Sequence, residues 1–60
     1  MSKKAVEKLF DSLYLLTDLR QIFRETSPNH ELKKEQVEEV KKIVKEVREN
    51  LDEIEEEMSE

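Results

Sequence analysis

Carboxylates and one histidine are the side chains in this sequence whose types would allow metal or acid–base chemistry. The chain holds 16 Asp and Glu, no Cys, and a single His at position 30. Acidic residues three positions apart share one face of a helix, and such pairs can bind Mg²⁺. Two such pairs exist: Glu35 with Glu38, and Glu49 with Asp52. A segment as acidic as residues 31–60 contains these spacings by chance, so a solvated acidic face is the simpler interpretation.

Other kinds of active site lack their usual parts. Di-metal four-helix bundles combine inward-facing Glu with Glu-x-x-His motifs. Here the residue three before His30 is Ser27. Nucleophilic catalysis needs a Cys, Ser or Lys activated by a neighbouring base, and the sequence offers no such combination. We therefore predict a protein that is not an enzyme and that uses no metal and no cofactor.

The composition predicts an all-α chain. Gly is absent, Pro occurs once, and charged residues make up 45% of the sequence. The turns of a sheet need Gly, Asn or Pro, and the regular spacing of the apolar residues argues against disorder. No stretch approaches the ~18 apolar residues of a membrane span, and no secretory signal is recognisable at the N-terminus. We expect a cytoplasmic protein that does not associate with membranes.

One break divides the chain into two helices. Residues 24–31 contain no apolar side chain, and Pro28 lies inside this gap, where it disfavours a continuous helix. We predict a first helix over about residues 2–26, a turn over about 27–30, and a second helix over about 29–58. An antiparallel hairpin is the favoured arrangement. The heptad phase also allows one long helix kinked at Pro28.

Both helices carry side chains at the 3-4 spacing of a coiled coil. In the second helix this stripe is Val37, Val40, Val44, Val47, Leu51, Ile54 and Met58. In the first helix it is Val6, Leu9, Leu13, Leu16, Arg20 and Phe23. We expect the two stripes to pack against each other within the hairpin. Ser27 is the expected N-cap of the second helix, with Asn29 as a second candidate.

The first helix carries more apolar surface than one neighbouring helix can cover. Leu15, Leu19 and Ile22 form one flank of its stripe, and Phe10 and Tyr14 form the other. Short chains without disulfides or metals often gain stability by oligomerisation. We therefore predict self-association, most simply as a two-fold dimer that forms a four-helix bundle, with a trimer or tetramer still open. The candidate self-association residues are Leu9, Leu13, Leu15, Leu16, Leu19, Ile22 and Phe23.

One flank should meet a second subunit, and the other is a candidate site for a foreign protein. Phe10 and Tyr14 are the candidate residues for such a partner. Arg20 interrupts the stripe of the first helix, and three roles are open for it. It can extend past the stripe into solvent, fix the register or oligomeric state, or bind an anion.

Two classes of function remain after these exclusions. The first is a non-enzymatic protein–protein interaction or regulatory module that acts through helix packing. The alternative is a nucleic-acid-binding dimer that uses basic residues near the turn: Arg20, Arg24, Lys33 and Lys34. A net charge of −5 opposes binding to a polyanion, so we regard nucleic acid as the weaker alternative.

Overall fold

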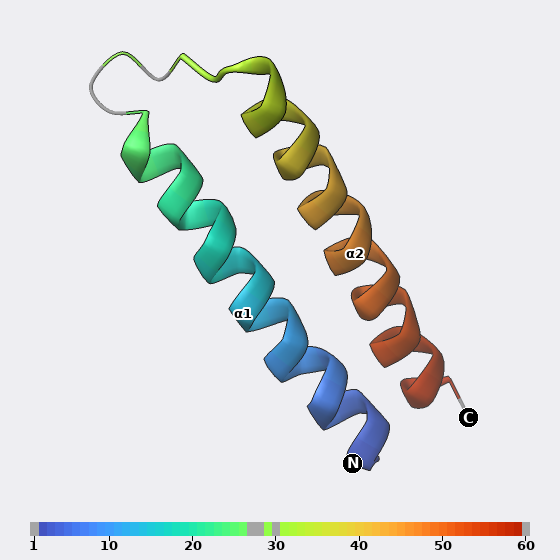
Figure 1. Cartoon of the computed structure of the whole chain (residues 1–60). Helices are drawn as coiled ribbons and strands as arrows, with labels where there is room; N and C mark the ends of the chain where they lie inside the picture. The colour runs from blue at the N-terminus through green and yellow to red at the C-terminus, as the bar shows by residue number, and fades with distance from the viewer. Residues whose placement is uncertain (1, 27–28, 30, 60) are drawn as a thin grey trace.

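The computed structural model describes residues 2–26, 29 and 31–59, and these form a helical hairpin. Helices α1 (Lys3–Glu25) and α2 (Lys34–Met58) lie side by side and run in opposite directions (Figure 1). The predicted all-α hairpin is thereby confirmed, and a single kinked helix is excluded. The Cα atoms span 45 × 15 × 12 Å, so the molecule is one layer of two helices. Within the described residues, neither helix has an apolar run long enough to cross a bilayer.

Side chains close to the backbone define both ends of α1. Ser2 is the N-cap, in extended conformation, and its Oγ accepts a hydrogen bond of 3.1 Å from the backbone N–H of Ala5. At the other end, the Thr26 hydroxyl donates to the carbonyl oxygen of Phe23 at 2.8 Å. These local bonds satisfy groups that a helix terminus leaves unpaired. They place the helix within one residue of its predicted bounds.

Helix α2 begins at Lys34, about five residues later than predicted. Lys33 is extended, and its backbone N–H donates to Oε1 of Gln36 at 2.9 Å, which fixes the first turn from inside the helix. The predicted cap at Ser27, the break at Pro28 and the lone His30 lie outside the described residues. The other candidate cap, Asn29, is exposed and lies before the helix begins.

The stripe of α1 that faces α2 differs from the predicted one. Its least exposed residues recur at a spacing of 3-4-3-4-3-4: Ala5, Lys8, Ser12, Leu15, Leu19, Ile22 and the C-cap Thr26. Every other residue of α1 except Val6 is exposed, including the predicted contacts Leu9, Leu13, Leu16 and Phe23. The predicted flank of Leu15, Leu19 and Ile22 is therefore the real contact stripe. The expectation that Val6 to Phe23 packs against the second helix was wrong.

Small and hydroxyl-bearing residues explain this choice of face. Ala5 and Ser12 are the most buried residues of α1, and their small size lets the two helix backbones approach closely. The Ser12 hydroxyl donates to the carbonyl oxygen of Lys8 at 2.8 Å, so its burial leaves no unpaired polar group. When the stripes of α1 are compared by the hydropathy of their residues, Ala5 and Ser12 count for little. The prediction from sequence therefore chose the neighbouring stripe, which is more apolar.

Helix α2 meets α1 with a stripe that only partly matches the prediction. We assign its contact positions from burial at the 3-4 spacing, as Gln36, Val40, Ile43, Val47, Asn50, Ile54 and Glu57; Val37, Val44, Glu46 and Glu53, next to this line, are half-buried as well. Ile43 and Val47 are its buried residues. Three members of the predicted stripe, Val40, Val47 and Ile54, belong to this set. The other four lie one position further round the helix.

Candidate interaction surface

An apolar face covers one side of the hairpin, next to the line where the helices meet. Each of its residues follows a contact residue by one position, which is a rotation of about 100° about the helix axis. Because the rotation has the same sense along each chain and the helices are antiparallel, both sets turn to the same side of the layer. In α1 the set is Val6, Leu9, Leu13, Leu16, Arg20 and Phe23. In α2 it is Val37, Lys41, Val44, Arg48, Leu51, Glu55 and Met58.

The large side chains of this face are open to solvent in the single hairpin. Six of them have exposed fractions between 43 and 57%: Leu9, Leu13, Leu16, Phe23, Leu51 and Met58. Single exposed apolar residues are normal on protein surfaces, whereas a continuous row of them marks an interaction site. The row follows α1, where Arg20 interrupts it, and α2, where its apolar members alternate with Lys41, Arg48 and Glu55. The apolar face is therefore the candidate interaction surface of the chain.

The core beneath this face is small. Among the described residues, the buried apolar side chains are Ala5, Ile43 and Val47, and no large side chain is completely buried. A helix buries its apolar stripe by packing in layers, and most domains contain at least two layers. A single layer leaves most of its apolar side chains in contact with water.

The opposite side of the hairpin is a polar face with strong negative charge. It consists of the residues that precede each contact position by one. In α1 these are Lys4, Glu7, Asp11, Tyr14, Asp18, Gln21 and Glu25, and in α2 they are Glu35, Glu39, Lys42, Glu46, Glu49, Glu53 and Glu56. Ten acidic and two basic residues give this face a net charge of −8. Two copies of this face would repel each other.

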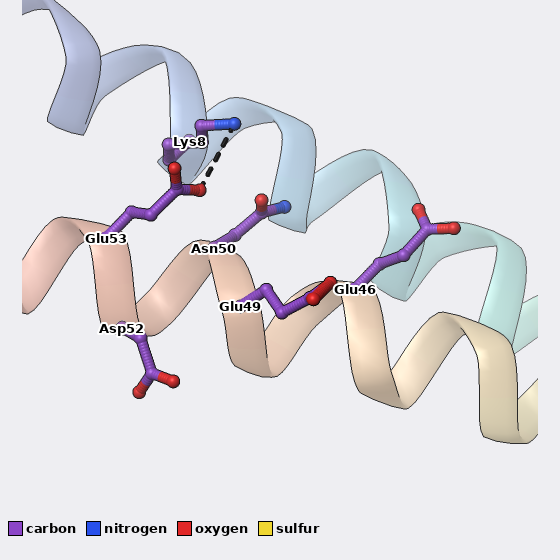
Figure 2. A pocket seen from close by; sticks show the side chains of 6 residues that line it. All are labelled: Lys8, Glu46, Glu49, Asn50, Asp52 and Glu53. Carbon is purple, nitrogen blue, oxygen red and sulfur yellow. Dashed lines mark ion pairs between the residues drawn. The ribbon is translucent and has the colours of Figure 1, made fainter.

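A shallow hollow on the polar face gathers carboxylates, but they do not converge on a common point (Figure 2). Glu53 turns toward α1, where its carboxylate lies 3.2 Å from Nζ of Lys8 and 3.8 Å from Nζ of Lys4. Asp52 also lines the hollow but points away from Glu49, with which it forms one of the acidic pairs noted in the sequence (Figure 2). Across the part of the chain that the structure describes, no group of carboxylates is arranged to hold a metal ion.

The remaining candidate residues do not gather in one site. Phe10 and Tyr14 are 54 and 73% exposed, and Tyr14 lies on the polar face, where it lines a hollow with Glu46 and Asn50 of α2. Arg20 is exposed and belongs to the apolar face, on which Lys41 also lies. The other basic residues near the turn, Arg24, Lys33 and Lys34, are exposed as well.

Sequence reasoning missed the contribution of α2 to the exposed surface. Val37, Val44, Leu51 and Met58 were assigned to contacts inside the hairpin, yet they line the apolar face. The sequence did contain a signal. The residue that precedes each α2 contact position by one is Glu at six of seven places and Lys at the seventh, so this side of the helix is charged. On the opposite side of the contact line four of the seven α2 residues are apolar, so that side carries apolar surface beyond the contact with α1.

Comparison with protein-family models, with curated proteins and with solved structures found no match for this chain.

Proposed function

We propose that this chain is a small, non-enzymatic helical protein of the cytoplasm that self-associates through its apolar face and serves as a protein–protein interaction or regulatory module. The observation that carries the proposal is the set of exposed Leu, Phe and Met side chains that the two helices present on one face of the hairpin. A second copy supplies the same apolar side chains, and the two faces pair by two-fold symmetry.

The exposed area of the hairpin supports a missing partner of about its own size. The chain exposes 5099 Å², whereas a compact monomer of 7.2 kDa would expose about 4,100 Å². The excess of roughly 1,000 Å² is close to the ~800 Å² that each subunit buries in an interface of ordinary size. A dimer would bring the exposed area of each subunit to that of a compact domain.

The direction of the apolar side chains also fits a four-helix bundle. In such a bundle each helix packs against two neighbours, and its apolar arc points to the centre between them. In α1 the arc runs from the contact residues Leu15 and Leu19 to Leu13 and Leu16 of the apolar face. In α2 it runs from Val40 and Val47 to the neighbouring apolar face. In both helices the centre of the apolar arc therefore points between the other helix of the hairpin and the apolar face, which is the direction of the centre of a four-helix bundle.

The nucleic-acid alternative has less support. Of its basic residues, Arg20 lies on the face that self-association would cover, whereas Arg24, Lys33 and Lys34 are exposed near the turn. The polar face carries a net charge of −8 and would repel a polyanion.

Sedimentation equilibrium tests the proposal. We expect the mass of a dimer, twice 7.2 kDa, at concentrations of tens of micromolar. Because folding is coupled to association, the melting temperature of the helical signal should rise with protein concentration. A monomer of 7.2 kDa with a concentration-independent melting temperature would exclude self-association.

A further inference from the structure

Two-fold symmetry allows two ways of placing a second copy against the apolar face, and they differ in where the turns lie. If the axis runs along the helices, both turns lie at the same end, and α1 packs on the partner's α2. If the axis runs across the helices, the turns lie at opposite ends, and each helix packs antiparallel on its own copy. Both keep the interface self-complementary.

Apolar side chains match in both arrangements. Lys8 lies beside Glu53, so residues whose numbers add to about 61 are level across the hairpin. With the turns at one end, Leu16 therefore meets the partner's Val44. With the turns at opposite ends, the apolar rows have their midpoints between Tyr14 and Leu15 in α1 and between Val47 and Arg48 in α2. The two midpoints lie at the same height along the hairpin to within about one residue, or ~1.5 Å. A single two-fold axis across the hairpin can therefore pass through the middle of both apolar rows.

Charge distinguishes the two arrangements at the level of Lys41. With the turns at the same end, Arg20 approaches the partner's Lys41 twice in each dimer, and Glu55 has no basic neighbour across the interface. With the turns at opposite ends, Lys41 lies about seven residues before the midpoint of its helix, opposite the partner's Glu55 about seven residues after it. In this arrangement Lys41 is therefore attracted to the partner's Glu55 instead of being repelled by the partner's Arg20, and the attraction occurs twice in each dimer.

The ends of α2 add to this difference. Residues 47–58 contain one basic and six acidic side chains, a net charge of −5. Turns at the same end would place the two segments at the same level, whereas turns at opposite ends make them run from the axis in opposite directions, with their centres ~15 Å apart along the bundle. The one like-charge approach that this arrangement creates is Arg48 with its own copy near the axis. Asp52, four residues further along the same helix, is placed to offset it.

We propose that the hairpin dimerises with its turns at opposite ends, so that the turn of each copy lies over the acidic end of the other. This inference rests on the proposed self-association and specifies its geometry. Arg20 then faces the partner's Leu9 and reaches solvent past it, with the aliphatic part of its side chain covering the edge of the interface.

Distances between spin labels test the arrangement, because the chain has no native Cys. Single cysteines are placed at Glu31, near the turn, and at Lys3, at the open end; both positions are exposed. In a hairpin 45 Å long, turns at opposite ends should give roughly 35 Å or more between two Glu31 labels and between two Lys3 labels. A mixture of the two labelled proteins should add a distance below about 25 Å.

The outcomes separate the geometry from the self-association itself. A dimer mass with short Glu31–Glu31 and Lys3–Lys3 distances would overturn the opposite-end arrangement and leave self-association in place. A monomer mass without dipolar coupling would overturn self-association. Circular dichroism of each labelled variant checks that it retains the helicity of the unlabelled chain.

Discussion

Leu15 and Leu16 are neighbours in the sequence but belong to different faces of α1. Leu15 lies in the stripe that faces α2, and Leu16 lies on the exposed apolar face. The helix thus divides its apolar residues between a contact that the chain makes with itself and a surface that remains open. This division explains how a chain with so much apolar surface in α1 can form a hairpin and still leave an apolar face open to solvent.

Replacing Leu16 by Glu should dissociate the protein. The change removes two buried leucines per dimer and places two charges in the interface, so we expect association to weaken by at least ~3 kcal/mol. Sedimentation equilibrium measures the effect. The matched control is Gln21→Glu, which adds the same charge to the same helix on the polar face. An unchanged dimer in Leu16→Glu would show that the apolar face is not the interface.

Replacing the buried Ser12 by Glu should destabilise the hairpin itself. Ser12 is 3% exposed in the stripe of α1 that faces α2, so a carboxylate there would lose its hydration or force the helices apart. We expect the free energy of unfolding in urea to fall by about 2–4 kcal/mol. Thr17→Glu, at an exposed position of α1, should change it by less than ~0.5 kcal/mol. Equal effects of the two substitutions would contradict the assigned contact stripe.

How much of this could be read from the sequence depends on the kind of residue. The two helices, their approximate bounds and the hairpin follow from the heptad spacing and the polar gap around Pro28. The choice of contact stripe does not, because Ala5 and Ser12 contribute through small size and internal hydrogen bonding rather than through hydropathy. The start of α2 was also missed, since its first turn is fixed by the Gln36 side chain and Lys33 is not a residue typical of N-caps.

The ion pair between Lys8 and Glu53 should contribute little to stability. Both side chains keep about a third of their exposure, so water screens the attraction. We expect Lys8→Met to change the free energy of unfolding by no more than ~1 kcal/mol, because Met keeps the apolar stem in the contact stripe. Urea unfolding at low and high salt measures it. A large loss that disappears in high salt would show that the pair is stronger than its exposure indicates.

Replacing Arg20 by Leu should preserve or raise the stability of the dimer. Arg20 is exposed and lies on the apolar face, where a Leu would extend the row from Leu16 to Phe23. Concentration-matched urea unfolding measures the change, and Arg24→Leu, outside the face, serves as control. A loss above ~3 kcal/mol would instead mean that Arg20 belongs to a buried ion pair whose other member is left uncompensated.

Exchanging the charges of Lys41 and Glu55 provides the sharpest chemical test of the opposite-end dimer. Lys41→Glu should weaken association several-fold, because two interfacial attractions become repulsions of up to ~1 kcal/mol each. Adding Glu55→Lys should restore the affinity. Lys42→Glu, on the polar face, changes the net charge equally and should have a smaller effect. With turns at the same end, Lys41→Glu would instead face the partner's Arg20 and strengthen the dimer, so the sign of the change at low salt decides between the two geometries.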